Sequence, residues 1–581
     1  MSSPKSRLEQ VTNHLGSSGS NDQHLATRFR PRMPSGLHPS YSPLNPCYFL
    51  LRAAQVRPNH LAVWHFEKNL KWTYEQWATR VCQLAYALKQ RGIQRGDRVL
   101  VLGPNVPFVA DALQAIPAVQ GVIVAVNTRL NPSDVEYIVD NSGAKLVLVD
   151  AQFESLVKNI KVPVVRCDDS GQAQDPYEQL LKQGAEYDGQ LGGHGWAGLE
   201  MQRDELATFA ISYTSGTTSR PKGVETSYRG TYLAGVANAV ESGMTSSSVY
   251  LWILPMFHCL GWCYPFACTM SMSTQLCLRQ VGDYNEVWRS ILERGVTHYC
   301  GAPTVQLAIA THKMARKPPQ LVRTTVAGAA PTATLIKQIE ELGIDITHVY
   351  GLTETYGPMT QGYFLDANAT TYYEDKARQG HAFRMADDIR VVRLIPEGEE
   401  HKVKEGDLKE VAFDGQEVGE IVMRGNLVMK GYWKNKEATD KGFAGGYFHT
   451  GDLAVRRPDG TFAIQDRSKD IIISGGENIS SLSIESALSA HPDVLEVACV
   501  ARSHEKWGER PHAFVVLKEG SSWHGRQVDF ETELKTFSRG KMPAFAIPEW
   551  VEVVPMLEKT STGKVQKHVL RDKLKKSMAK L

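Results

Sequence analysis

From about residue 41, segments with the apolar spacing of helices alternate with short runs that are wholly apolar. The first helix is predicted after Thr73, which forms a capping box with Gln76, and it ends before Gly92. Its apolar face consists of Trp77, Val81, Leu84, Ala85 and Leu88. The runs at 99–102 and 146–149 suit strands that are buried on both sides. This alternation predicts a mainly parallel sheet with helices on both faces.

The pattern changes twice further along the chain. From about residue 390, short β-like runs separated by Gly, Asp and Pro predict a small barrel or antiparallel sheet. From about residue 470, a strand, a helix, two strands, a second helix and a strand at 551–554 precede a basic tail. The predicted fold class is therefore α/β. A large N-terminal domain (41–468) of parallel α/β subdomains plus a small barrel is followed by a smaller α+β C-terminal domain (469–581).

Residues 1–40 form a tail of different composition, rich in Ser, Gly, Asn, Arg and Pro. Such a segment is too polar to bury a core, and we expect it to be flexible. One patch departs from this, because Leu8, Val11 and Leu15 follow the spacing of an amphipathic helix. The tail is therefore expected to carry a recognition segment rather than part of the core.

Composition and charge exclude several classes of protein. Lys plus Arg number 65 and Asp plus Glu 63, so no global positive field would steer the chain to nucleic acid. The nine cysteines include no Cys-x-x-Cys pair and no zinc set, which is typical of a reducing compartment, and we expect buried apolar thiols. The most apolar stretch, 252–272, contains two prolines and a histidine, so no transmembrane segment is predicted.

A stretch rich in hydroxyl groups, YTSGTTSRPKGV at 213–224, is a candidate for phosphate binding. Its small residues would let backbone N–H groups approach phosphate oxygens, and its hydroxyl groups would donate further hydrogen bonds. It is not a Walker A loop, because that loop requires Gly-Lys-Ser/Thr and here Lys222 precedes Gly223. On composition alone, a flexible surface loop would be favoured.

Taken with later motifs, this stretch resembles the phosphate-binding signature of the AMP-forming adenylating superfamily. That superfamily includes acyl-CoA synthetases, aryl-CoA ligases, peptide-synthetase adenylation domains and beetle luciferases. Between about residues 41 and 572 the further motifs stand in the family's order: AGAAP at 327–331, YGLTE at 350–354, YFHTGD at 447–452, DRSKDIIISGGEN at 466–478 and PMLEKTSTGK at 555–564. The resemblance implies an ATP-dependent acyl-CoA ligase that uses ATP, Mg²⁺ and CoA, releases AMP and diphosphate, and has a mobile C-terminal domain.

The resemblance also implies which residues would bind the nucleotide. Tyr350 would stack on adenine, Asp452 would accept from both ribose hydroxyls, and Arg467 would contact ribose or phosphate. Thr217 and Glu354 would hold Mg²⁺ together with substrate phosphates. The other implied nucleotide-binding positions are Thr214, Ser215, Gly216, Thr218, Lys222, Gly328, Ala329, Ala330, Pro331, Gly351, Leu352 and Thr353.

The C-terminal motifs imply a second set of roles. Lys564 would supply the cation that meets the α-phosphate and the carboxylate as charge develops in the transition state. Lys469 would be the hinge about which the C-terminal domain rotates after adenylation. After the rotation, Gly475, Gly476 and Glu477 would lie near the pantetheine of CoA.

Each of these roles has a plainer alternative that the sequence leaves open. Lys564 is one of several lysines in a basic tail, Glu354 could be an acid at a helix start, and Asp452 a turn aspartate. Arg467 could form a surface ion pair. For the whole chain, a luciferase-like oxidase and a non-catalytic nucleotide-binding protein are alternatives to a ligase.

The stretch PMFHCLGW at 255–262 resembles the segment that lines the acyl pocket of fatty-acyl and aryl CoA ligases. The aromatic residues Phe257, Trp262, Tyr264 and Phe266 would suit a nonpolar acyl chain, although aromatic stripes of this kind are more often part of a core. Gly301 begins the stretch GAPT at 301–304, which matches another pocket turn of the family. His258 would gate the reaction centre, with core packing as its alternative. The start SRLEQVTNHL, the overall length and the same pocket also resemble fungal ligases of siderophore biosynthesis, which activate mevalonate. The substrate implied by this resemblance is mevalonate, and a medium-chain fatty acid or an aryl acid is the alternative.

Both ends of the chain carry candidate targeting signals. Ala579-Lys580-Leu581 resembles the peroxisomal Ser-Lys-Leu terminus. Arg7-Leu8, five residues and His14-Leu15 match the N-terminal type of peroxisomal signal. Together they predict peroxisomal import receptors as partners. The cytoplasm is the alternative location, because a basic tail can end in this triplet by chance.

Overall fold

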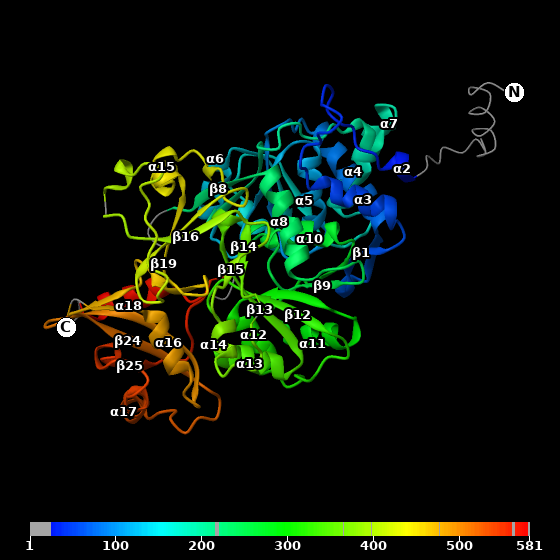
Figure 1. The fold of residues 1–581 in the computed structure, drawn as a ribbon. Coiled ribbons are helices and arrows are strands. Elements are labelled where there is room, and N and C mark those ends of the chain that lie inside the picture. The colour runs from blue at the N-terminus through cyan, green and yellow to red at the C-terminus, as the bar shows by residue number, and fades with distance from the viewer. Residues whose placement is uncertain are drawn as a thin grey trace.

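The structure, a computed structural model, describes residues 25–214, 220–363, 365–396, 398–475, 477–560 and 564–578 of the 581-residue chain. The blue to green part of the chain forms sheets with helices around them, and yellow strands lie beside it (Figure 1). The orange to red C-terminal part forms a separate lobe next to the yellow strands (Figure 1). This mixed α/β architecture confirms the predicted fold class.

One large sheet has nine strands in the described part of the chain, and six neighbouring strands in it run parallel. In spatial order they are β15 (His381–Ala382), β14 (Gly357–Gln361), β13 (Ile344–Leu352), β12 (Val322–Val326), β11 (His298–Gly301), β9 (Val249–Trp252), β10 (Thr274–Cys277), β1 (Leu61–His65) and β2 (Leu70–Thr73). Antiparallel pairing is confined to the edges, at β2, β14 and β15. The carboxyl ends of β12 and β13 therefore meet, at the kind of position where open α/β sheets bind ligands.

A second sheet has seven strands among the described residues. In spatial order they are β18 (Gly431–Tyr432), β8 (Lys222–Ser227), β7 (Thr208–Thr214), β4 (Val122–Ala125), β3 (Arg98–Leu102), β5 (Ala144–Asp150) and β6 (Val164–Cys167). The strands predicted at 99–102 and 146–149 are confirmed as β3 and β5, which pair in parallel. Strands β7 and β8 pair antiparallel, and the hydroxyl-rich stretch connects them.

Helices connect the strands of both sheets, as the alternation predicts. Helix α4 (Tyr74–Gln90) begins at the predicted capping box, in which Thr73 and Gln76 bond each other's side chain and backbone. Its predicted apolar face is fully buried. The other helices of this part are α2 (Leu25–Arg28), α3 (Cys47–Val56), α5 (Pro107–Ala118), α6 (Pro132–Ser142), α7 (Pro176–Gln190), α8 (Tyr228–Glu241), α9 (Cys259–Trp262), α10 (Tyr264–Met270), α11 (Tyr284–Glu293), α12 (Pro303–Ala310), α13 (Ala333–Glu341), α14 (Tyr372–Lys376) and α15 (Lys436–Gly442).

A short part of the predicted N-terminal tail, around Phe29, packs against the core. Phe29 is 1% exposed and belongs to the main core, and its carbonyl accepts a hydrogen bond from Gln55 Nε2 at 3.0 Å. Arg28 pairs with Glu75 at 2.6 Å. The expectation of a flexible tail is therefore wrong for this stretch. Phe29 is buried in the core, and the average composition of the segment does not reveal the contribution of a single aromatic side chain. The amphipathic patch at 7–15 lies outside the described residues.

The expected antiparallel sheet follows the second large sheet in the chain. Its four strands among the described residues are β16 (Asp388–Val392), β17 (Val418–Arg424), β19 (Phe448–Arg456) and β20 (Phe462–Arg467). All neighbours in it are antiparallel, which confirms the small antiparallel sheet. The alternative of a small barrel is wrong for the described residues, because β16 and β20 stand at opposite edges of the sheet and do not pair with each other. Its last pair places Asp452 opposite Arg467.

The C-terminal lobe packs helices on a mostly antiparallel sheet. Its strands are β22 (Glu477–Ile479), β21 (Ile472–Ser474), β24 (Gly508–Leu517), β23 (Val494–His504) and β25 (Trp550–Val553), and its helices are α16 (Ser481–Ser489), α17 (Gln527–Ser538) and α18 (Lys567–Met578). The order of elements is as predicted, except that two short strands, β21 and β22, precede the first helix in place of one, and that the end differs. The segment predicted only as a basic tail contains α18, because Leu570 and Leu574 bury its apolar side in a cluster with Phe514.

The cysteines and the most apolar stretch of the chain lie inside the fold. All nine cysteines are buried free thiols, as predicted. The apolar stretch at 252–272 folds into the end of β9 and the short helices α9 and α10. Across the described ranges, no helix combines the length and the apolar character that crossing a membrane requires.

Candidate functional site

The carboxyl ends of β12 and β13 open into two of the predicted motifs. After β12, Gly328 has a φ of 87°, a left-handed conformation that favours glycine. The turn from Gly328 to Ala330 is exposed, whereas Pro331 is buried. After β13, Glu354 lies in a single 3-10 turn, Thr353–Thr355. Because β12 and β13 are parallel neighbours, the two motifs lie side by side.

Asp452 lies at the centre of a hydrogen-bonded cluster and is 4% exposed. The Tyr350 hydroxyl, 102 positions away in sequence, donates to its Oδ2 at 2.7 Å, and Arg467 Nε donates to its Oδ1 at 3.1 Å. Each carboxylate oxygen can accept more than one hydrogen bond. Asp452 could therefore also accept from two neighbouring hydroxyl groups, such as those of a ribose. The structure thus brings together three residues that the motifs single out separately.

Glu354 is the candidate carboxylate for a metal ion. Burial raises its pKa, and the Tyr432 hydroxyl donates to its Oε1 at 2.9 Å. In the described ranges, no group of three or more His, Cys, Asp or Glu side chains could hold a metal ion by itself. One carboxylate suffices for Mg²⁺ where substrate phosphates supply other ligands, and a cation would relieve the cost of burying this charge. The residues present therefore fit a metal ion that arrives with a nucleotide.

The hydroxyl-rich turn begins and ends at described residues. Thr214 ends β7 and pairs with Lys222, the first residue of β8. The ammonium group of Lys222 lies 5.1 Å from the centre of the Tyr432 ring, the same side chain that bonds Glu354. This end of the turn is therefore linked to the candidate metal ligand. The predicted phosphate-binding residues Ser215, Gly216, Thr217 and Thr218 lie outside the described residues.

The C-terminal lobe carries Lys564 to the Asp452 cluster. Burial, and then the positive charge of Arg467, lower the pKa of Lys564 to about 7, while Asp452 acts in the opposite direction. Burial, and then the charge of Lys564, lower the pKa of His258 to about 4. The backbone of Lys564 is fixed by Thr560, whose N–H donates to the Lys564 carbonyl at 2.7 Å. The amine therefore lies within electrostatic reach of both the Asp452 cluster and His258.

The predicted hinge and CoA-side residues lie on the lobe side of this cluster. Lys469 follows β20, and its pKa is lowered by burial and by two neighbouring arginines. Gly475 has a φ of 61°, and its N–H donates to the carbonyl of Trp507 at 2.8 Å. A Cβ at Gly475 would lie 2.9 Å from the Trp507 ring, which explains the glycine. Glu477 is exposed in β22, and Gly476 lies outside the described residues.

The predicted acyl-pocket segment adopts an unusual backbone. Five consecutive residues, Cys259–Cys263, have φ values between 50° and 61°. Such a left-handed conformation costs about 1–2 kcal/mol for each residue other than glycine. Asn238 of α8 holds the turn, because its Nδ2 donates to the Trp262 carbonyl at 2.7 Å. Phe257 and Trp262 are 9% and 5% exposed, and a Cβ at Gly301 would lie 2.7 Å from Val305.

Two residues of the site have no counterpart in the sequence analysis. Tyr432 bonds Glu354 from a short strand almost eighty positions away, and nothing local in its sequence marks that contact. Asn238 fixes the left-handed turn from the middle of α8, where it is 2% exposed. A polar residue among small and apolar helix neighbours was the available signal for Asn238, since buried polar groups need a partner.

Comparison with known proteins agrees with this geometry. Residues 50–433 match the AMP-binding enzyme family, and residues 483–564 match the AMP-binding enzyme C-terminal domain. An acetate–CoA ligase of Humulus lupulus is 43% identical, over 92% of this chain and 95% of the length of that ligase. A peroxisomal acetate/butyrate–CoA ligase of Arabidopsis thaliana is 38% identical, over 95% of this chain and 98% of the length of that ligase. The fold resembles that of ATP-bound MatB from Rhodopseudomonas palustris, with a TM-score of 0.78 at 23% identity over 92% of this chain and 99% of the other. The chain therefore belongs to the AMP-binding enzyme family, among its AMP-forming acyl-CoA synthetases.

Proposed function

We propose that the protein joins a short carboxylic acid to CoA through an acyl-adenylate. In the first half-reaction, a carboxylate oxygen of the acid attacks the α-phosphorus of ATP and diphosphate leaves. In the second, the sulfur of CoA attacks the acyl carbon, the thiol proton is released to solvent, and AMP leaves. Two anions meet in the first step, so it requires cations and donors aimed at the α-phosphate.

The observation that carries the proposal is the position of Lys564. Its amine comes from the C-terminal lobe, yet its pKa responds first to burial and then to Arg467 and Asp452 of the N-terminal part. A buried ammonium group among other cations is unfavourable in the free protein. Two anionic substrates would remove that cost, which supports a role for Lys564 at the α-phosphate.

The other proposed roles follow the same arrangement. Asp452 and Tyr350 would hold the ribose and adenine, and Thr214 with the turn after it would hold the phosphates. Glu354, with Thr217, would hold Mg²⁺, which when bound would neutralise phosphate charge. The proposed moving units are residues 41–468 and 469–581, with Lys469 at the hinge between them.

The proposal of a short acid draws support from the relatives. The relative at 43% identity is named for acetate, and the one at 38% for acetate and butyrate. Relatives named for cinnamate and benzoate are 36% and 34% identical. Mevalonate, a short hydroxy acid, is included in the proposed range, and medium-chain fatty acids and aryl acids are the alternatives to be tested.

We also propose that the enzyme works in the peroxisome. Several relatives are named peroxisomal, including those for acetate/butyrate, cinnamate and benzoate. Both candidate signals, at 7–15 and 579–581, lie outside the described residues. The test uses a fluorescent fusion from which each signal is removed separately, and then both together. The signal whose removal abolishes peroxisomal fluorescence is the one that import receptors bind. Diffuse fluorescence of the intact chain would favour the cytoplasm.

One experiment tests the reaction directly. The purified chain is incubated with ATP, Mg²⁺, CoA and single acids, including acetate, butyrate, mevalonate, octanoate and cinnamate, and mass spectrometry identifies any thioester. We expect CoA-dependent AMP release with the short acids. Light or CO₂ without thioester would favour an oxidase, and ATP binding without diphosphate release would favour a non-catalytic binding protein.

A further inference from the structure

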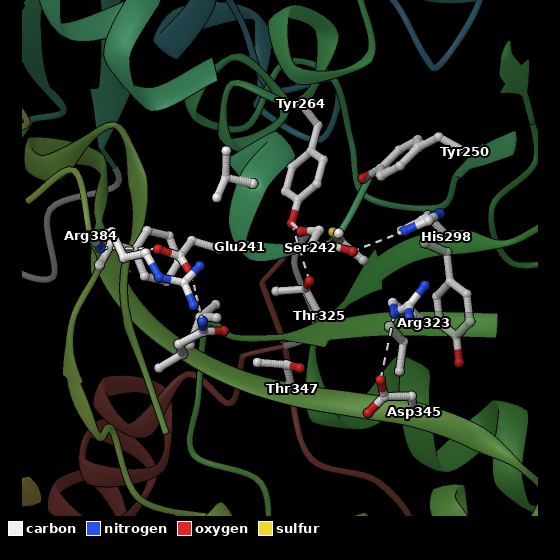
Figure 2. A pocket seen from close by; sticks show the side chains of 18 residues that line it. Glu241, Ser242, Tyr250, Tyr264, His298, Arg323, Thr325, Asp345, Thr347 and Arg384 are labelled. Carbon is white, nitrogen blue, oxygen red and sulfur yellow. Dashed lines mark hydrogen bonds and ion pairs between the residues drawn. The ribbon is translucent and has the colours of Figure 1, made fainter. Parts of the chain in front are cut away.

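A cavity of about 210 Å³ lies between the end of α8 and the face of the nine-stranded sheet (Figure 2). Strands β11, β12 and β13 contribute one wall, through residues that include Cys300, Thr325 and Val349. Tyr250 of β9, the strand beside β11, also lines the cavity, as do the end of α8 and Tyr264 of α10. The cavity therefore shares strands β12 and β13 with the candidate site.

The strands that line this cavity continue into the functional site. Thr325 is three residues before Gly328, and Val349 is two residues before Gly351. Since a strand advances about 3.3 Å per residue, the cavity wall lies on the order of 10 Å from the turn at Gly328. Alternation along a strand places Val349 and Gly351 on the same face. An acyl group that extends from the reaction centre along this face would point toward the cavity.

Tyr264 stands across this path. Its hydroxyl lies 2.7 Å from Ser242 Oγ and 3.1 Å from Thr325 Oγ1, so it bridges α8's end and β12 (Figure 2). Its ring stacks on Tyr250 with a centroid separation of 5.1 Å, and the side chain is 2% exposed. Contacts at both the hydroxyl and the ring fix Tyr264 in one position. In the chain, Tyr264 follows the end of the predicted acyl-pocket segment at Trp262 by two residues.

The far side of Tyr264 is polar. His298 Nε2 lies 3.0 Å from the Ser242 carbonyl, and burial lowers the pKa of His298 to about 4, so it is neutral. Arg323 and Asp345 form an ion pair at 3.7 Å at the solvent side, where their side chains are 42% and 47% exposed (Figure 2). Hydrogen-bonding groups and ions are poor neighbours for an alkyl chain, because burying them without partners is costly. The cavity is therefore unsuited to an apolar acyl tail.

We propose that Tyr264, held by Ser242 and Thr325, is the floor of the acyl pocket and restricts the enzyme to short acids. The inference rests on the proposed acyl-CoA ligase function and adds the residue that sets the length limit. A methylene that fits or fails to fit an apolar pocket changes kcat/KM about 10–200-fold. The wild-type enzyme should accordingly lose activity steeply between butyrate and octanoate.

The test measures kcat/KM for butyrate and octanoate with the full chain, ATP, Mg²⁺ and CoA. Tyr264→Ala and Tyr264→Leu replace the aromatic ring by a smaller side chain. They should raise the ratio of kcat/KM for octanoate to kcat/KM for butyrate at least about tenfold. Tyr264→Phe keeps the ring and should leave the ratio within about threefold of wild type. Tyr250→Phe is the matched control, because Tyr250 stacks on Tyr264 and lines the same cavity but does not bond Ser242 or Thr325.

Each outcome has a defined meaning. An unchanged ratio in Tyr264 variants that still use butyrate would overturn the inference and leave the ligase function intact. Equal use of octanoate and butyrate by the wild type would overturn it without any variant, even if the shortened variants failed to fold. Absence of thioester with every acid would instead refute the proposed function.

Discussion

Raising the pH should slow the adenylation half-reaction through a single amine. In the free protein, burial and nearby positive charge lower the pKa of Lys564 to about 7. The amine is then charged in about nine molecules of ten at pH 6 and in about one of ten at pH 8. Because kcat/KM reports the free enzyme, its value for ATP should fall about tenfold per pH unit above pH 7. Bound ATP favours the charged amine, so the fall in kcat should occur at higher pH.

His258 and Glu354 act outside this window or in the opposite direction. His258, with a pKa of about 4, is already neutral from pH 6 upward. Burial raises the pKa of Glu354, so its carboxylate gains a proton, and activity is lost, as the pH falls rather than as it rises. Lys469, whose pKa is lowered by burial and two arginines, and His449, whose pKa is raised by a neighbouring glutamate despite burial, also lose a proton as the pH rises. The loss above pH 7 is therefore assigned to Lys564 only by a variant at that position.

The assay follows diphosphate release from ATP with a saturating acid between pH 6 and 9. Lys564→Arg is the matched control, because a guanidinium group stays protonated and should give a lower rate that does not fall above pH 7. Lys564→Ala should slow adenylation about 10²–10³-fold and spare thioester formation from a supplied acyl-adenylate. The same decline in Lys564→Arg, no decline in the wild type, or full adenylation by Lys564→Ala would each refute the reasoning.

Further outcomes are expected at the rest of the site. Asp452→Asn removes the anion that two neighbours bond, so the KM for ATP in diphosphate release should rise about tenfold or more; an unchanged KM would contradict the ribose role. Glu354→Gln should raise the Mg²⁺ concentration that gives half-maximal diphosphate release, and an identical Mg²⁺ titration would argue against a metal ligand. Asn238→Leu leaves the Trp262 carbonyl without its hydrogen bond. The free energy of unfolding in urea should therefore fall by about 1–3 kcal/mol, and the KM for the acid should rise. If neither quantity changed, the turn would not need this hydrogen bond. A thiol reagent should label none of the nine cysteines in the native protein and all of them in urea, and rapid native labelling would contradict their burial.

Local patterns were sufficient for much of the fold. The capping box at Thr73 and the apolar runs at 99–102 and 146–149 depend on neighbours in sequence, and all three are confirmed. Phe29 and helix α18 were missed, because the burial of a few apolar side chains in a polar segment depends on distant surfaces. Average composition does not report such burial.

The site divides in the same way. The motifs name Tyr350, Asp452 and Lys564, but their meeting requires contacts across more than a hundred positions and between two lobes. Tyr432 was missed because its partner Glu354 is distant in sequence and its own segment is an ordinary short strand. The left-handed turn was missed because only one of its five residues is a glycine, so local propensity argues against it.

If the left-handed turn lines the acyl pocket as proposed, it couples the recognition of the acid to the integrity of the whole N-terminal domain. Four residues other than glycine hold a left-handed backbone between Cys259 and Cys263, at a combined cost of about 4–8 kcal/mol. The isolated segment would not adopt this shape, and the hydrogen bond from Asn238 and the packing of Trp262 on Gly357 maintain it from outside. Mutations that loosen the core far from this turn would therefore reduce the difference in kcat/KM between acids. Binding of ATP, which depends on residues of neighbouring strands, would be retained.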